Sequence, residues 1–297
     1  MPNLLDIRRR IRSVKNTQQI TQAMKMVSAA KLRRAQEQAL QARPYARQLA
    51  ELMAGLAPFL DASELGELGG LLDRREIRRR LVIVVTTDSG LVGAFNANVL
   101  KAVWALPGRP GSAGSTDTVY LAAGRKGRDA LKRRGLTVAA EHVGLFARTI
   151  DHAIAKQIAA EAMRAYTAAE VDEVLLVGNQ FKSVLQQVVS TTRLLPFEPP
   201  TAENAAEKAA AVRDYIFEAP PAQMLAELLP RTIESQVFRA LLESLASEHA
   251  ARMNAMEAAT SNAGDLIDSL TLNMNRVRQA AITREIIEVV SGAAALD

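Results

Sequence analysis

The N-terminal part of the chain carries the hydrophobic pattern of a long amphipathic helix. Over residues 3 to 59, apolar residues recur three and four positions apart, as in the seam of a coiled coil. Polar Gln18 and Thr21 interrupt the stripe, and Pro44 is expected to bend or break the helix. The apolar members of the stripe are Leu4, Ile7, Ile11, Val14, Met24, Val27 and Ala35.

The C-terminal part repeats this pattern over residues 223 to 290, with Pro230 expected near the helix start. The stripe contains Leu241, Leu245, Leu266, Leu270, Met274, Val277 and Ala281. At ~1.5 Å per residue, this helix would reach about 100 Å and the N-terminal one about 80 Å. Two such helices, one on each side of a compact middle region, are predicted to pair as an antiparallel coiled coil.

The middle of the chain alternates short β-branched runs with helical stretches, which predicts a Rossmann-like α/β domain with a parallel sheet. The expected strands are 80–86, 119–123 and 173–177, and the expected helices lie around 97–106, 126–134 and 149–168. Residues 181–191 could add an edge strand or a hairpin. The predicted organisation is a coiled-coil helix (1–60), a charged linker (61–80), the α/β domain (81–195), a connecting segment (196–221) and a second coiled-coil helix (222–297).

Composition excludes several classes of site. There are no cysteines, so disulfides, thiolate nucleophiles and cysteine-ligated metals are ruled out, and the three histidines show no metal-binding spacing. No apolar run approaches the ~18 residues of a membrane-spanning helix. The net charge of +5 is unevenly distributed: the chain through Gln48 has eleven basic and two acidic residues, whereas six basic and ten acidic residues follow Pro221.

Two glycine-containing turns stand where nucleotide-binding folds place phosphate loops, namely residues 87–93 (TDSGLVG) and 124–127 (GRKG). Neither has the complete dinucleotide or P-loop spacing, which favours turn glycines over a cofactor site. Asp88 and Asn96 are plausible helix caps. Residues 247–249 (SEH) cannot form a triad among themselves on one helix, and a solvated helix face is expected there.

The C-terminal stretch 278–295 contains a specific motif: Ile-Thr-x-Glu, an acidic residue three positions on, and Gly-Ala four further; these residues are Ile282, Thr283, Glu285, Glu288, Gly292 and Ala293. This motif resembles the C-terminal signature of the gamma subunits of F-type ATP synthases. Residues 7–27 and 43–46 (RPYA) resemble the gamma N-terminus. The loop 87–93 is similar too, although Ser89 stands where members usually carry a basic residue. The cysteine-bearing insert of chloroplast members is absent.

The resemblance implies a non-catalytic rotor subunit without a bound cofactor or metal. Its partners would be the ring of alpha and beta subunits, the epsilon subunit and the ring of c subunits. The implied contacts with beta are Met24, Arg252, Arg278, Gln279, Thr283 and Glu285. The implied location is peripheral, on the cytoplasmic face of a bacterial plasma membrane.

Two alternatives remain open from the residues alone. A Rossmann-like enzyme with helical arms would bind a nucleotide as an isolated chain. A basic coiled-coil protein that binds nucleic acid would show strongly salt-dependent DNA binding, but the chain has no recognised nucleic-acid motif. Neither alternative accounts for the C-terminal signature.

Overall fold

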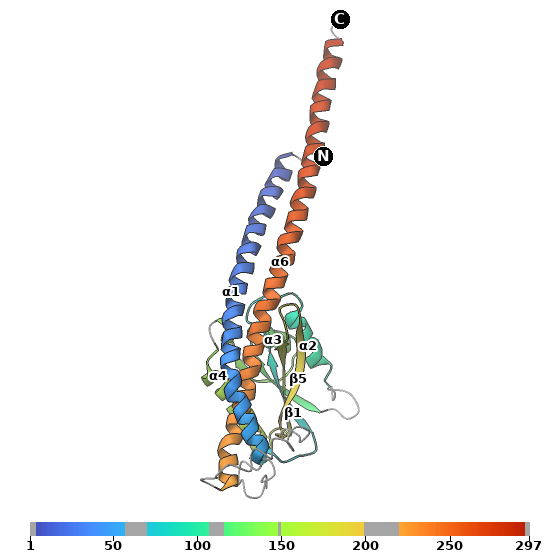
Figure 1. Ribbon diagram of the computed structural model, residues 1–297. Coiled ribbons are helices and arrows are strands. Elements are labelled where there is room, and N and C mark those ends of the chain that lie inside the picture. Colours follow the sequence, from blue (N-terminus) through green and yellow to red (C-terminus); the bar gives the residue numbers. More distant parts are fainter. Residues whose placement is uncertain (1–3, 57–69, 107–115, 148–149, 199–219, 295–297) are drawn as a thin grey trace. The chain divides into compact units, whose positions relative to one another are not determined.

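The computed structural model describes residues 4–56, 70–106, 116–147, 150–198 and 220–294 (Figure 1). The chain forms two compact units: residues 1–29 with 252–297, and residues 30–251. The two long helices, α1 (Leu4–Leu56) and α6 (Pro221–Ala294), contribute to both units, which confirms the predicted terminal helices. Most of the predicted linker and connecting segment lies outside the described residues.

The larger unit, residues 30–251, is built on a five-stranded sheet of order β3-β2-β1-β4-β5. The strands are β1 (Arg79–Val85), β2 (Asp117–Ala123), β3 (Val138–His142), β4 (Glu173–Phe181) and β5 (Gln187–Leu195). The first four are parallel and β5 is antiparallel to β4, which confirms both the parallel sheet and the predicted edge strand. The edge strand β3 is missing from the sequence prediction, because its five residues are only half-buried and lack a continuous apolar run.

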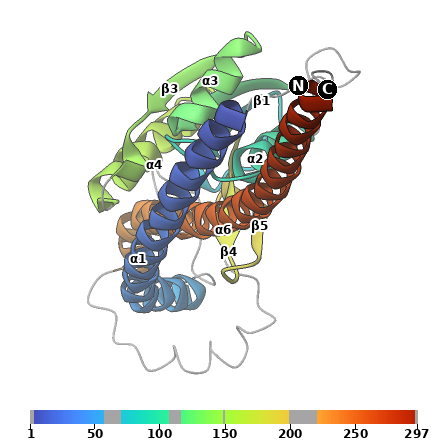
Figure 2. The ribbon, with the colours of Figure 1, turned by 90° about the horizontal axis from the view of Figure 1, so that it is seen from above.

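Alternating residues of β1 divide the core of this unit into two layers. Ile83 and Val85 belong to a cluster formed with α4 (His152–Thr167) and with segments of α1 and α6. Val82 and Val84 pack on the other face with α2 (Phe95–Trp104) and with Leu131 of α3 (Arg125–Arg133). Figure 2 shows α3 beside β3 at one edge of the sheet and the β4–β5 hairpin toward the other. Burial on both faces explains the uninterrupted apolar sequence of β1.

One segment of α6 within this unit is buried on every side. All residues from Ser244 to Ala250 are buried, including Ser247, Glu248 and His249. The prediction of a solvated face at residues 247–249 is therefore wrong. A helix surrounded by neighbours loses the polar face that a surface helix shows.

The sequence predicts that Pro44 bends or breaks the first helix; a break is excluded, because α1 continues as one helix to Leu56. Buried residues follow Pro44 at Leu49 and Met53, so tertiary packing holds the helix beyond the proline. Packing energy of this kind can offset the roughly 3 kcal/mol cost of an internal proline.

The smaller unit, residues 1–29 with 252–297, contains an antiparallel pair of helices. The Nζ atom of Lys25 lies 2.8 Å from Oε1 of Glu257. The hydroxyl oxygens of Thr21 and Thr260 are hydrogen-bonded at 2.7 Å, and a Cβ added at Gly264 would lie 3.3 Å from Nε2 of Gln18. As residue numbers decrease along α1, the numbers of the contacting residues on α6 increase, which confirms the antiparallel pairing.

The seam between these helices differs from the predicted one. Gln18, Thr21 and Ser28 lie in it, with Thr21 and Ser28 buried, so the polar residues that seemed to interrupt the stripe continue it. Val27 and Leu266, predicted seam members, are 56% and 48% exposed. Because apolar residues can be spaced either three or four positions apart, the sequence does not fix which of two adjacent residues faces the partner helix. Contact with the partner helix decides which of the two is buried.

The C-terminal end of α6 continues beyond α1 within this unit (Figure 1). Carried back to Leu4, the register of the pair reaches about position 278 of α6. Every residue from Ile282 to Ser291 is exposed. Among the described residues, no helix has a segment long and apolar enough to span a membrane.

Candidate functional sites

The six predicted contact residues fall into two groups on the smaller unit. Met24 and Arg252 are half-buried, whereas Arg278, Gln279, Thr283 and Glu285 are exposed. About 26 residues of continuous helix separate Arg252 from Arg278, which corresponds to about 40 Å. The six residues therefore do not form one site.

The four exposed residues lie at the C-terminal end of α6, where charged, polar and apolar side chains occur together. Arg278 and Glu285 are seven positions apart and share one face of α6. The Thr283 hydroxyl donates to the Gln279 carbonyl oxygen at 2.9 Å. Large apolar side chains are exposed on the same stretch: Ile282, Ile286, Ile287, Val289 and Val290. Exposed apolar side chains on an unpaired helix indicate a surface that binds another protein.

In the larger unit, the RPYA motif lines an open groove between α1 and α6. The groove has a volume of about 1020 Å³. Pro44 and Tyr45 line it together with Phe238 and with His152 of α4, whose ring centroid lies 5.2 Å from that of Phe238. The groove is a mostly apolar surface for which the sequence gives no occupant.

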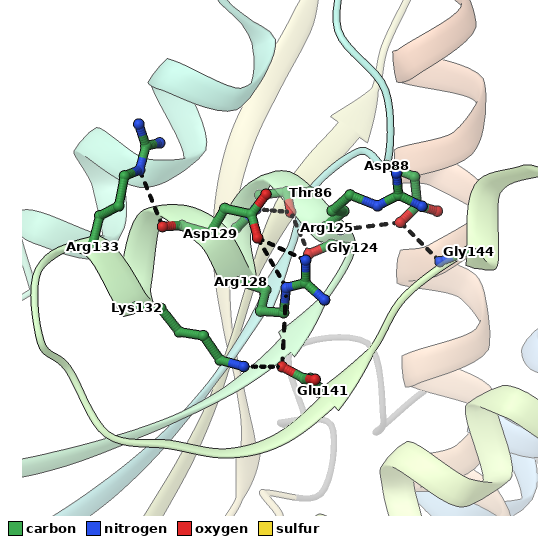
Figure 3. Close-up of polar contacts among 11 residues, drawn as sticks. Thr86, Asp88, Gly124, Arg125, Arg128, Asp129, Lys132, Arg133, Glu141 and Gly144 are labelled. Atoms are coloured by element: carbon green, nitrogen blue, oxygen red, sulfur yellow. Dashed lines mark hydrogen bonds and ion pairs between the residues drawn. The ribbon is translucent and has the colours of Figure 1, made fainter.

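A dense polar network closes the carboxyl edge of the sheet in the larger unit (Figure 3). The first three amides of α3 donate to three consecutive residues that follow β1. The Arg125 N–H donates to Oδ1 of Asp88 at 3.0 Å, the Lys126 N–H to the Thr87 carbonyl at 3.0 Å, and the Gly127 N–H to the Thr86 hydroxyl at 2.8 Å. Amides that a helix start leaves without partners are thus satisfied by the loop of another strand.

The Asp88 carboxylate also accepts two hydrogen bonds from the segment after β3. The Gly144 N–H donates to Oδ1 at 2.9 Å and the Phe146 N–H to Oδ2 at 3.1 Å. Asp88 therefore caps a helix, as expected, but the helix is α3 and not the one that follows it in sequence. Asn96 is not an N-cap; its side chain exchanges hydrogen bonds with Thr87 at 3.0 and 2.8 Å.

Two glycines let the loops approach this closely. Gly124 has φ of 113°, and a Cβ there would lie 2.1 Å from the Thr86 carbonyl oxygen. A Cβ at Gly127 would lie 2.6 Å from the Thr86 hydroxyl oxygen. Of the predicted turn glycines, Gly124 and Gly127 are therefore packing glycines, whereas a Cβ added at Gly90 or Gly93 would meet nothing within 4 Å.

Helix α3 carries ion pairs on its outer face. The hydrogen bond from Arg128 lowers the pKa of the Asp129 carboxyl, and the hydrogen bond from Lys132 lowers the pKa of Glu141 on β3. Arg128 and Asp129 are half-buried and Lys132 and Glu141 are exposed, so their pairing contributes little to stability. Lys132 and Glu141 join α3 to β3 along the sheet edge.

Sequence reasoning did not find the Asp88 network or the polar seam. The signal for the first was an Asp three residues after a buried strand, together with glycines after the next two strands. The partners lie up to 58 positions from Asp88, so no local pattern could pair them. The seam could have been found by letting Gln18 and Thr21 occupy heptad positions.

Comparisons with known proteins agree on one family. The family model described as ATP synthase matches residues 3–296. The ATP synthase gamma chain of Solibacter usitatus is 52% identical over 297 residues, with full coverage of both chains. The ATP synthase gamma chain of Pelotomaculum thermopropionicum is 47% identical, also with full coverage of both.

Solved structures with the same fold come from mitochondrial ATP synthases. A chain of the Euglena gracilis rotor has a TM-score of 0.65 at 20% identity, covering 94% of this chain and 98% of that one. A chain of the Tetrahymena thermophila central stalk and c-ring has a TM-score of 0.58 at 24% identity, covering 81% and 99%. These two likenesses concern the fold; the full-length relatives and the family model show that this chain belongs to the ATP synthase gamma chain family.

Proposed function

We propose that this chain is the central-stalk rotor of an F-type ATP synthase. It is a non-catalytic subunit that couples ion flow through the membrane sector to ATP synthesis or hydrolysis at the beta subunits. The observation that carries the proposal is the end of α6, where Ile286 and Val289 are 57% and 73% exposed on a helix without an α1 partner. In a ring of alpha and beta subunits, this stretch would be covered.

The energetics suit a protein that delivers work in portions. One elementary charge crossing 100 mV releases about 2.3 kcal/mol, so several translocations must be pooled for one synthesis event. An asymmetric helix pair does this by stabilising different beta conformations in turn, because a binding partner shifts an equilibrium by its differential affinity for the two states.

The proposed contacts with beta are the two groups on the smaller unit. Arg278, Gln279, Thr283 and Glu285 present exposed polar groups at the end of α6, while Met24 and Arg252 stand farther along the helix pair. Exposed ion pairs contribute about 1 kcal/mol or less each, so contacts of this kind can form and break as the stalk turns.

The further proposed partners are the alpha and epsilon subunits and the c-ring, and the proposed location is peripheral, on the cytoplasmic face of a bacterial plasma membrane. The chain is proposed to bind no cofactor itself. The filled network around Asp88 supports this last point, because protein atoms already engage the amides at the start of α3.

Reconstitution tests the rotor function directly. The purified chain is mixed with matched alpha and beta subunits, and ATP hydrolysis is followed together with single-molecule rotation of a bead attached to this chain. A stoichiometric complex in which the chain turns during hydrolysis is the expected result. Failure to associate with competent alpha and beta subunits would overturn the proposal.

The contact role of Met24 is tested by Met24→Lys. A cation at this half-buried position is expected to form an over-strong pair with a beta carboxylate and to impair ATP-driven proton pumping more than assembly. Met26→Lys is the matched control, because Met26 is 63% exposed and lies about 200° away around α1. Normal pumping by the Met24 variant would exclude this contact.

A further inference from the structure

At the carboxyl edge of the sheet in the larger unit, backbone N–H groups are arranged as in a phosphate-binding site, but a side chain of the protein occupies the place of the phosphate. In doubly wound sheets, anions bind where backbone N–H groups gather at a helix start beyond the carboxyl ends of the strands. Here the amides of Arg125, Gly144 and Phe146 converge on one carboxylate, that of Asp88, at 2.9 to 3.1 Å.

The remaining amides of the helix start are engaged as well. The Lys126 and Gly127 N–H groups donate to Thr87 and Thr86, and the Arg128 N–H returns to the Gly124 carbonyl at 3.2 Å as the first helical hydrogen bond. Each N–H at the beginning of α3 therefore has a protein acceptor. A nucleotide phosphate could enter only by displacing Asp88.

Further hydrogen bonds hold the loop to which Asp88 belongs. The Thr87 hydroxyl donates to the Ser89 carbonyl at 2.6 Å, and Asn96 holds Thr87 from the first turn of α2. Two residues beyond, Leu91 adopts φ of 63° while 61% exposed. A left-handed backbone is unfavourable for leucine, so the surrounding hydrogen bonds hold the loop in this shape.

We propose that Asp88 is a built-in anion that occupies the phosphate position of this α/β domain, fixing the loop 88–93 and making the domain indifferent to ATP, ADP and phosphate. Asp88 acts as a positioning residue. The functional benefit of this indifference rests on the proposed rotor role, because the stalk of an ATP synthase is exposed to ATP, ADP and phosphate. A domain of nucleotide-binding topology there would otherwise change shape with their concentrations.

Anion rescue tests the proposal. The full-length chain, assembled with matched alpha and beta subunits, is prepared as wild type and as Asp88→Ala, and amide hydrogen exchange is measured at residues 124–127 and 144–146. The variant is expected to exchange about tenfold faster or more at the amides of Arg125, Gly144 and Phe146, since their shared acceptor is gone, and less so at the neighbouring amides that have other acceptors. Added inorganic phosphate or formate is expected to restore protection in the variant and to change nothing in the wild type.

Asp172→Ala is the matched control. Oδ2 of Asp172 also accepts two backbone amides, those of Arg78 and Arg79 at 2.9 and 2.8 Å, but at the opposite edge of the same sheet and away from any helix start. Exchange near residues 78–79 is expected to rise in this variant without rescue by either anion. Equal rescue in both variants would show general salt stabilisation and would overturn the proposal.

Asp88→Asn covers the case in which the alanine variant does not fold. The isosteric amide keeps the position filled but neutral, so exchange is expected to rise less, and phosphate is expected to have no effect. The proposal fails if the asparagine variant responds to phosphate, if wild type binds phosphate at these amides, or if the alanine variant stays protected without an added anion. Rotation of the wild-type complex is scored separately, so failure here leaves the rotor proposal intact, and the reverse also holds.

Discussion

The two units bury different kinds of side chain. In the larger unit the sheet core is Val, Ile and Leu, and Ile83 and Val84 are fully buried. In the smaller unit Ile7 and Met256 are buried too, but the helix pair also meets through Thr21, Ser28, Thr260 and Ala263, while large apolar side chains such as Ile286 remain exposed. The larger unit therefore has its own hydrophobic core, whereas the smaller one leaves apolar surface for partners to cover.

The largest effect is expected where the loop at Gly124 packs against Thr86 in the larger unit. Gly124→Ala would place a Cβ 2.1 Å from the Thr86 carbonyl oxygen at a positive φ, so we expect a loss of about 3 kcal/mol or more in unfolding free energy. Gly90→Ala, with nothing within 4 Å, is the control and is expected to change stability by about 0.5 kcal/mol or less. Urea denaturation of the full chain measures both; similar midpoints would contradict the packing role of Gly124.

The next prediction compares isoleucines of the two units. Ile83→Ala removes fully buried methyl and methylene groups and is expected to cost about 2–5 kcal/mol in the isolated chain. Ile286→Ala, at a 57% exposed position, is expected to leave the isolated chain unchanged but to weaken assembly with alpha and beta. Denaturation and titration of the complex separate the two effects, and an unchanged assembly constant for the Ile286 variant would argue that no partner covers this face.

A smaller effect is expected at the polar seam. Thr21→Val and Thr260→Val each remove one partner of the 2.7 Å hydroxyl contact and should each cost about 1 kcal/mol. The double variant should cost less than their sum, because the coupling energy is recovered when both polar groups are gone. Thr17→Val, whose exposed hydroxyl bonds only within its own helix among the contacts described, is the control. Strict additivity in the cycle would show that the two hydroxyls do not interact.

The smallest expected effect is that of the Lys25–Glu257 ion pair, whose side chains are 38% and 58% exposed. Glu257→Gln should cost less than about 1 kcal/mol, and the difference should shrink as salt is added. Stability measured at low and high salt checks this. A cost independent of salt would mean that Glu257 acts through packing instead of charge.

The sequence by itself determined the elements that have a local physical signature. Apolar residues spaced three and four positions apart identified both long helices, and β-branched runs identified β1, β2 and β4. Each of these patterns follows from the geometry of a single element. The motifs at the two ends were enough to indicate the gamma chain family. The predicted contact residues stay a prediction.

Only the tertiary structure decided which side chains meet. Gln18 and Thr21 lie in the seam because Thr260 and Gly264 stand opposite, and Ser247 to His249 are buried because neighbours surround α6. Asp88 closes the carboxyl edge through amides that follow two other strands. These outcomes depend on segments far apart in the chain, and a hydrogen bond between such segments has no trace in the sequence around either partner.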